Sequence, residues 1–343
     1  MTFLSAPCAA TIDIDSAVYT NSSPPMRPAT PAGPTAQAPL TKLVHSAPHI
    51  HYTHSFCAMT TQCELTFYGV DTVQGDAIAA IIEARVMLLA TRYNFHSADS
   101  WLTQTVNDRR HNRVAIDADF AQVLVTVREH AKRCGGVFDI TVGTLAARIK
   151  LAKSTREIAQ IKKQLQRFTG LARWSVGCDT SGHYLAFDNP ITRIDLGGVI
   201  KEYAVDESAR IARAAGVESG IVNYGGDLSC WGKKPDSQRF IAGVPDPRSP
   251  EHMLFGLDLL DQAMTTSGHY ARKRSLKDGE ASHIIGPQRS PWLSCSVVSK
   301  SALVSGIYST ALLLANTNLV SHNLPPETLA VVVNRNGEVQ HLN

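Results

Sequence analysis

The amino-acid sequence predicts an α+β protein in which helices pack on sheets, with a tail before the folded domain. Segments typical of β-strands cluster between separate amphipathic helices, which favours α+β over a regular βαβ winding. Of the 343 residues, 44% are hydrophobic and 18% are charged, as in globular proteins. Eight of the 17 prolines lie before residue 50. We therefore expect residues 1–50 to form a disordered Pro/Ala-rich tail and residues 51–343 to form one domain.

Three histidines, His49, His51 and His54, follow the Pro-rich segment. Imidazole is the commonest metal ligand, so the three could hold a metal ion. No Cys or carboxylate completes the set, and we prefer to interpret them as chance histidines of a partly solvated tail. The P-x-x-P spacing between Pro25 and Pro34 leaves a second role open for the tail, the binding of partners in an extended form.

The folded domain is expected to begin near Phe56, and its first predicted strand is Glu64–Tyr68, which alternates and stops at Gly69. Further strands are predicted at 183–187, 219–224, 239–244, 255–259, 294–299 and 328–334. The pair Asn336–Gly337 after the last of them predicts a hairpin.

Five segments carry apolar residues at helical spacing. They are 75–91, a segment around 120–127, one that follows Ser154 and Thr155, Ala204–Ala215, and Ala302–Ala315. Asp117 or Asp119 can cap the second helix, and Gly135–Gly136 follows its end. Gly216 is predicted to stop the fourth helix.

Composition excludes several classes of protein. A net charge of +3 argues against nucleic-acid binding by bulk electrostatics. No run of 18 apolar residues could form a transmembrane segment. Seven cysteines without a C-x-x-C pair do not form a disulfide scaffold or zinc module. The N-terminus has neither a basic segment nor a long apolar core, which argues against an export signal. A proline precedes Cys8, which argues against lipidation. We therefore expect a cytoplasmic protein.

Three glycine-rich stretches are candidates for anion binding: Cys134–Asp139, Asp195–Lys201 and Asn223–Asp227. Paired glycines allow close approach to a ligand and can offer backbone N–H groups to a phosphate. Lys201 could meet that phosphate where a helix begins. None of the stretches fits the Rossmann or P-loop pattern, and each taken singly is more often a turn.

In their order along the chain, these stretches and their neighbours resemble the FAD:protein FMN transferase family, the ApbE-type flavin transferases. Residues 135–143 are similar to the G-G-x-F-D-x-T-V-G motif, and Asp195–Asp206 follows D-L-G-G-x-x-K-G-Y-A-x-D with one break. The other matching segments are Met59–Gly69, Tyr93–Asn107, Asn223–Asp227, Thr266–Gly268, Ser282–Ile285 and Ser309–Leu312. The resemblance covers about residues 56–335.

The resemblance implies an ApbE-like, T-fold-related domain of mixed sheets packed with helices. It implies a Mg²⁺-dependent enzyme that moves the FMN moiety of FAD onto a Thr or Ser hydroxyl of a target flavoprotein and releases AMP. By resemblance, the FAD site would hold Met59, Tyr93, Val137, Phe138, Asp139, Asp195, Lys201 and His269. The backbone carbonyl of Ile200 and the hydroxyl of Thr310 would bind the metal ion, and His283 would be the base. Taken singly, Met59 and Phe138 could be core residues, and Asp139 a turn or capping residue. Lys201 could be a solvated lysine at a helix start, His283 a structural histidine, and Thr310 a residue bonded to its own helix backbone.

Three positions depart from the family pattern. Gly306 stands where the family has an Asp one helical turn before the metal-binding Thr, and Gly286 stands where it has a second Asp. Glu202 replaces a Gly after Lys201, and could repel a phosphate or act as a replacement metal ligand. Asp227 and Asp261 are the other carboxylates that could fill this role. The departures leave two alternatives open, a non-catalytic FAD-binding homologue and a Mg²⁺-dependent FAD hydrolase, besides an interaction protein that uses the Pro-rich tail.

Overall fold

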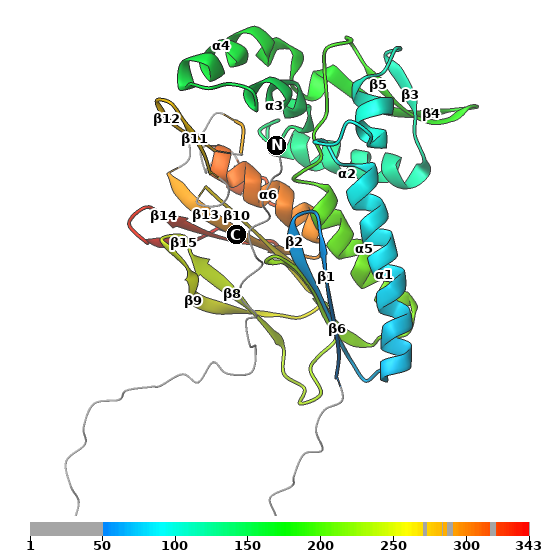
Figure 1. The fold of residues 1–343 in the computed structure, drawn as a ribbon. Coiled ribbons are helices and arrows are strands. Elements are labelled where there is room, and N and C mark those ends of the chain that lie inside the picture. Colours follow the sequence, from blue (N-terminus) through cyan, green and yellow to red (C-terminus); the bar gives the residue numbers. More distant parts are fainter. Residues whose placement is uncertain (1–50, 270–272, 283, 287–290, 316–319, 343) are drawn as a thin grey trace, which may run out of the picture. The chain divides into compact units, whose positions relative to one another are not determined.

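An antiparallel sheet of eight strands is the centre of the computed structural model, which describes residues 51–269, 273–282, 284–286, 291–315 and 320–342 (Figure 1). Its strands, in spatial order, are β1 (His51–Ala58), β2 (Thr61–Tyr68), β6 (Ser219–Tyr224), β7 (Asp227–Trp231), β10 (Gln262–Gly268), β13 (Trp292–Ser299), β14 (Leu329–Asn334) and β15 (Val339–Leu342).

Smaller sheets complete the β structure. They are β3 (Arg113–Ala115), β5 (Gly182–Phe187) and β4 (Trp174–Asp179) in one sheet, β8 (Phe240–Asp246) with β9 (Ser249–Leu259), and β11 (Lys273–Leu276) with β12 (Gly279–Ser282). The pairings recorded between the described strands are antiparallel, whereas sheets of mixed direction were expected. The predicted α+β class is confirmed.

Helices α1 (Thr72–Arg92), α5 (Ile200–Ala214) and α6 (Ala302–Leu314) pack on one face of the large sheet. The other main helices are α2 (Ala118–Arg133), α3 (Gly143–Ile149) and α4 (Thr155–Leu165). Shorter helical turns lie at Leu102–Asn107, Ile140–Val142, Gln166–Phe168 and Leu171–Arg173. Helix α6 packs on β10 and β13, and α5 packs on β7 and between α1 and α6 (Figure 1). None of the described helices is long and apolar enough to span a membrane.

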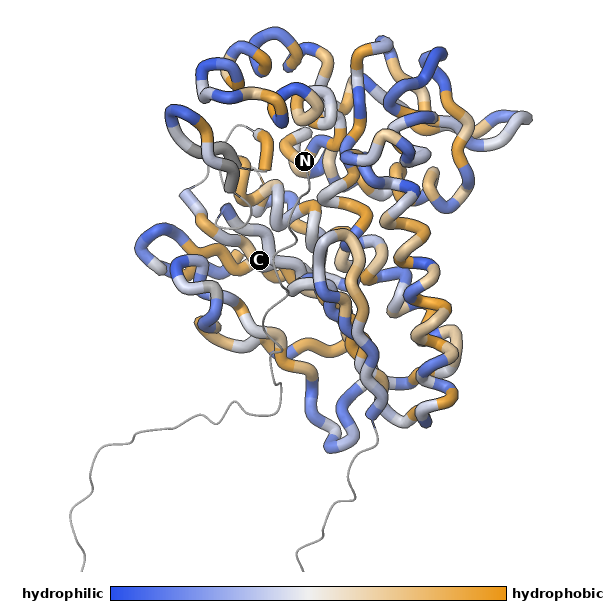
Figure 2. Tube along the Cα trace, viewed as in Figure 1, coloured by the Kyte–Doolittle hydropathy of each residue, from blue (hydrophilic) through white to orange (hydrophobic). Residues whose placement is uncertain are grey.

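The large sheet carries a hydrophobic core on each face. The main core includes residues of β2, β13 and α6, while a second cluster joins Leu228 and Met264 to Phe240 and Leu259 of the β8–β9 hairpin. Ala263 and Met264 are neighbours in β10 and lie in different clusters, as expected for side chains that alternate between the faces of a strand. Figure 2 shows that hydrophobic and hydrophilic residues follow one another along α1.

The five predicted helices are confirmed, although α1 and α5 begin three and four residues before their predicted starts. Asp117, not Asp119, caps α2, because its carboxylate accepts a hydrogen bond of 2.8 Å from the amide of Phe120. Ser154 caps α4 in the same way. Helix α5 begins at Ile200, four residues before the predicted start, and no side chain caps it there. The sequence therefore offers no cap residue to mark this beginning.

The predicted strands are present, but regular structure begins five residues before Phe56, where the first folded residues were expected. Strand β1 begins at His51, and the alternating residues Tyr52, Phe56 and Ala58 are buried against the main core. His51 and His54 therefore lie in a strand and not in a partly solvated tail, and the ring of His54 pairs with Glu83 at 2.9 Å. His49 lies outside the described residues.

The hairpin predicted at Asn336–Gly337 is confirmed between β14 and β15. Strands β7 and β10 were not predicted, although both carry site residues. All five residues of β7 are buried, including the polar Asp227 and Ser229, so polar and apolar positions in this short sequence do not mark an exposed and a buried face.

Candidate active site

Two turns from predicted motif segments lie side by side at one end of the large sheet. The β1–β2 turn holds Met59 and Thr60, both with positive φ (51° and 63°). The β6–β7 turn holds Gly225, where a Cβ would collide with the hydroxyl of Thr61. Strands β2 and β6 pair with Cys63 opposite Tyr224, which brings the two turns together. The φ of 63° favours glycine at position 225, and the close approach of the other turn requires it.

Lys201 connects the start of α5 to this end of the sheet. Its ammonium forms an ion pair with Asp227, the first residue of β7, and lies 3.5 Å from Oε1 of Glu202. Asp227 is buried and also accepts a hydrogen bond of 3.3 Å from the amide of Thr266. The motif segments at 195–206, 223–227 and 266–268 therefore meet at Lys201 and Asp227.

Hydroxyl groups from β10 and α6 face each other beside these charges. The Oγ atom of Ser267 lies 2.8 Å from Oγ of Ser309 and 3.2 Å from Oγ1 of Thr310. A ring nitrogen of His269 lies 3.4 Å from the carbonyl oxygen of Leu313, one helical turn further along α6. Ser267, which was not singled out as a site residue, is the link between the T-S-G segment and Thr310.

Glu202 fills the space next to Gly306. A Cβ at position 306 would lie 2.7 Å from Cγ and 3.3 Å from Cδ of Glu202. The Glu202 side chain is only 8% exposed, and its Oε2 has no hydrogen-bond partner. Gly306 and Thr310 are four residues apart and share one face of α6. A carboxylate from α5 therefore stands where a side chain at position 306 would stand.

A second group of predicted residues surrounds the turn before α5. The amide of Asp195 donates to the carbonyl of Ile140 at 2.7 Å, and Gly198 faces the buried ring of Phe138. Asp139 accepts hydrogen bonds from the amide and the hydroxyl of Thr141, so it caps the short helical turn at 140–142. Burial raises the pKa of both Asp139 and Asp195, against the opposing effect of their hydrogen bonds. Val137 packs at the edge of the same core.

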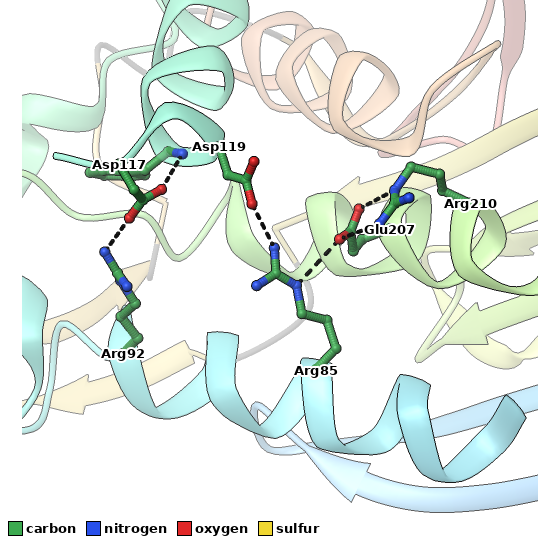
Figure 3. Close-up of polar contacts among 7 residues, drawn as sticks. Arg85, Arg92, Asp117, Asp119, Glu207 and Arg210 are labelled. Carbon is green, nitrogen blue, oxygen red and sulfur yellow. Dashed lines mark hydrogen bonds and ion pairs between the residues drawn. The ribbon is translucent and has the colours of Figure 1, made fainter. Parts of the chain in front are cut away.

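Tyr93 and Ile200 line a separate cleft of about 390 Å³ between α1, α2 and α5. The Tyr93 ring is 9% exposed and packs on Phe120, with 4.8 Å between ring centroids. Around the cleft, Arg85 binds Glu207 and Asp119, and Arg92 binds Asp117 (Figure 3). Tyr93 is thus partly a core residue, and Ile200 connects this cleft with the adjacent Lys201.

Three further residues singled out in the sequence are His283, Gly286 and Asp261. His283 lies outside the described residues. Gly286 packs on the end of α6, where a Cβ would come within 2.7 Å of the Leu314 side chain. Asp261 pairs with Arg213 in the last turn of α5. Lys201 is in the first turn, about 18 Å away along the helix axis, so Asp261 cannot act as the replacement carboxylate.

No cluster of three or more His, Cys, Asp or Glu side chains suited to a metal ion is found among the described residues. A cation at this site would therefore depend on hydroxyl and backbone oxygens together with one or two carboxylates. Oxygen ligands of this kind suit a hard divalent cation such as Mg²⁺.

Comparison with known proteins agrees with the motif order. The model of the ApbE family matches residues 59–327. A protein of Salmonella typhimurium named FAD:protein FMN transferase is 28% identical over 303 residues, which cover 82% of this chain and 83% of that protein. A protein of Escherichia coli with the same name is 25% identical over 273 residues, covering 76% of this chain and 74% of its own length.

Solved structures share the fold. The ApbE protein of Thermotoga maritima superposes with a TM-score of 0.75 at 22% identity, covering 86% of this chain and 97% of its own. The flavin transferase ApbE of Vibrio cholerae gives a TM-score of 0.69 at 18% identity, with the same coverage. The family model covers well over half of the sequence, and the chain belongs to the ApbE family.

Proposed function

We propose that this protein is an FAD:protein FMN transferase, which moves the FMN moiety of FAD onto a Thr or Ser hydroxyl of a target flavoprotein and releases AMP. The observation that carries the proposal is the meeting of Lys201 and Asp227 with the hydroxyls of Ser267 and Thr310 at one end of the sheet. These residues come from four motif segments that are far apart in the sequence. The relatives named FAD:protein FMN transferase support the same reaction.

The reaction exchanges one bond to phosphorus for another. The acceptor hydroxyl attacks the phosphorus on the FMN side of the pyrophosphate, the phosphoanhydride bond breaks, and AMP leaves with the bridging oxygen. Positioning and charge neutralisation supply most of the catalysis in such phosphoryl transfers. Lys201 is proposed to offset phosphate charge when FAD is bound, and His283 is proposed to take the hydroxyl proton, since imidazole titrates near neutral pH.

Mg²⁺ is the proposed metal ion, and the oxygen donors near Thr310 fit it. The unpartnered Oε2 of Glu202 is the observation that supports this fit. Thr310 and the carbonyl of Ile200 are the proposed ligands. Ile200 is the first residue of α5, so its carbonyl oxygen would bind the cation while it also accepts a hydrogen bond within the helix. A bound Mg²⁺ would neutralise charge on the pyrophosphate.

The proposed FAD site combines the two groups of residues around the start of α5. Met59, Val137 and Phe138 would supply apolar contact, and Tyr93 would contribute from the cleft at Ile200. Asp139, Asp195 and His269 are proposed as polar contacts. Asp139 already bonds Thr141, so its role toward FAD would be shared with a structural one.

A direct test follows two products at once. The purified full-length protein is incubated with FAD, with and without MgCl₂, and with a Thr-containing flavin-acceptor protein that an active relative modifies in a parallel reaction. AMP is measured by chromatography and the acceptor by mass spectrometry. We expect Mg²⁺-dependent AMP release with an equal amount of flavinylated acceptor.

Lys201→Met should abolish this activity, while Lys300→Met is a matched control, because Lys300 is exposed and pairs only with exposed Glu327. AMP release without labelling of the acceptor would indicate an FAD hydrolase. Stoichiometric FAD binding with neither product would indicate the non-catalytic flavin binder. Failure to bind FAD at all would contradict the proposal.

A further inference from the structure

We propose that Glu202 is the carboxylate ligand of the divalent cation, supplied from α5 because position 306 on α6 has no side chain. This inference rests on the proposed function of the same site. It states that the carboxylate ligand of the cation comes from α5 and not from α6.

The first support is a buried carboxylate oxygen that has no hydrogen-bond partner. The described part of the chain has six buried side-chain N or O atoms without a hydrogen-bond partner, and Oε2 of Glu202 is the only carboxylate oxygen among them. Leaving such an oxygen without a donor or cation is costly, and native structures rarely do so. Its other oxygen lies 3.5 Å from Lys201, whose ammonium is already paired with Asp227.

Two acidic neighbours on the same helix show that Glu202 is an exception. Asp206 accepts hydrogen bonds from the hydroxyl of Ser301 and from two backbone amides of α6. Glu207, whose side chain is 10% exposed, has both oxygens bonded to arginines. Buried carboxylates in α5 are therefore satisfied by the protein itself, except at Glu202.

The second support is the fit between Glu202 and Gly306. The 2.7 Å between Cγ of Glu202 and a Cβ built at position 306 is shorter than real contacts allow. The two positions can accommodate one side chain between them, and this chain has it on α5. The glutamate then reaches the face of α6 that carries Thr310 one turn later, beside the hydroxyl of Ser267.

The oxygen donors around Glu202 favour a hard divalent cation. One carboxylate oxygen, the hydroxyls of Thr310 and Ser267, and phosphate oxygens from a bound dinucleotide are all hard oxygen donors, which Mg²⁺ and Mn²⁺ prefer. The nearby Lys201 neutralises Asp227, which leaves Glu202 as the negative charge that a cation can take.

Cation binding measured separately from turnover tests this assignment. We would titrate Mn²⁺ into the full-length protein with saturating FAD and no acceptor, and follow free Mn²⁺ by electron paramagnetic resonance. Glu202→Gln keeps the shape of the side chain but removes its charge, and should weaken Mn²⁺ binding about ten-fold or more. Glu207→Gln is the matched control, a second buried glutamate of α5, and should leave Mn²⁺ affinity unchanged.

An exchange of the two positions gives a second, independent readout. Gly306→Asp alone should lower the melting temperature, because its Cβ collides with Glu202. The double variant E202G/G306D removes the collision and returns a carboxylate to the same space from α6. We expect it to recover a higher melting temperature and tighter Mn²⁺ binding than Glu202→Gln.

The stability without metal separates a ligand from a structural residue. Glu202→Gln should melt no lower than the unmodified protein in EDTA, and should lose the rise in melting temperature that MgCl₂ produces in the unmodified protein. The inference is overturned if Glu202→Gln binds Mn²⁺ as tightly as the unmodified protein, or if the unmodified protein binds none.

The two proposals can fail separately. AMP release with unchanged Mn²⁺ affinity in Glu202→Gln would keep the transferase and reject the ligand. Loss of Mn²⁺ binding in this variant, without AMP release by the unmodified protein, would keep the ligand and reject the transferase.

Discussion

Asp206 fixes the position of α6 relative to α5. Its carboxylate accepts hydrogen bonds of 2.7 Å from the hydroxyl of Ser301 and from the amide of Ala302, and one of 3.0 Å from the amide of Leu303. An acidic group suits the N-terminus of a helix, where amides are unpaired and the dipole is positive. Burial raises the pKa of Asp206, against the effect of these hydrogen bonds. The last Asp of the 195–206 motif therefore holds the helix that carries Thr310.

Replacement of Asp206 by Asn should lower the free energy of unfolding by about 2 kcal/mol. The side-chain NH₂ of the asparagine would face hydrogen-bond donors of α6, and the charge-assisted hydrogen bonds to the carboxylate would be lost. Urea unfolding measures the change. The matched control is Asp71→Asn at the N-cap of α1, where the side chain accepts only from the amide of Gln74. Asn caps a helix as well as Asp does, so we expect a change of roughly 0.5 kcal/mol or less there. Equal losses in the two variants would contradict the role given to Asp206.

At the scale of single residues, the sequence predicts which segments matter better than it predicts their contacts. Lys201 and Thr310 come from the resemblance, and the structure brings their segments together through Asp227 and Ser267. The packing of Glu202 on Gly306 could not be predicted in the same way. Glu202 was considered as a replacement ligand, but its fit depends on how two helices distant in sequence pack.

Helices α1, α2 and α5 are connected by a network of ion pairs. Arg85 of α1 lies between Asp119 of α2 and Glu207 of α5, and Glu207 also binds Arg210 (Figure 3). The hydrogen bond to Arg210 lowers the pKa of Glu207, burial opposes this, and the charges of Arg210 and Arg85 add to the lowering. The network therefore stabilises the helical layer only while Glu207 is ionised.

The stability that Glu207 contributes should depend on pH with a definite sign. Its pKa in the folded protein is below the ordinary value of 4.5, so the contribution is complete above pH 4.5 and is lost as the pH falls through the folded pKa. At pH 7 we expect Glu207→Gln to lower the free energy of unfolding by about 1–2 kcal/mol, a modest value because Arg210 is mostly exposed.

Urea unfolding of both proteins at pH 7, 5.5, 4 and 3 measures this difference. It should be constant between pH 7 and 5.5 and should shrink toward pH 3. A difference that stays the same at pH 3 would show that Glu207 acts through packing and not through its charge.

At the scale of elements, helices were easier to predict than strands. Capping residues such as Asp117 and Ser154, with the periodic apolar residues behind them, mark where helices begin. The missed strands lack such signals. Strand β7 is buried at every position, and the polar residues of β1 were interpreted as part of the tail. Strand β1 forms because it pairs with β2, and this tertiary contact cannot be recognised from the sequence of β1 alone.

The whole domain is held together by a sheet with a core on each face. Three cysteines, Cys63, Cys134 and Cys295, belong to the main core, and Cys230 belongs to the cluster under β8 and β9. Burial raises the pKa of Cys63 and Cys134 to about 12 and that of Cys230 to about 11. The predicted extent of the domain, residues 51–343, can be tested with these thiols, while the tail of residues 1–50 and the cytoplasmic location stay predictions.

If residues 51–343 form one cooperative unit, all four buried thiols should become reactive together. Neighbours in one strand, such as Ala263 and Met264 of β10, pack on opposite faces, so neither core can open without disturbing the sheet that supports the other. In native protein at pH 8, a thiol reagent should modify exposed Cys57 and Cys178 rapidly and the four buried cysteines slowly. In increasing urea, peptide mass spectrometry should give the same midpoint for Cys230 as for Cys63. A lower midpoint for Cys230 would instead show that the β8–β9 hairpin and its cluster unfold separately, and the domain would then consist of two units that share a sheet.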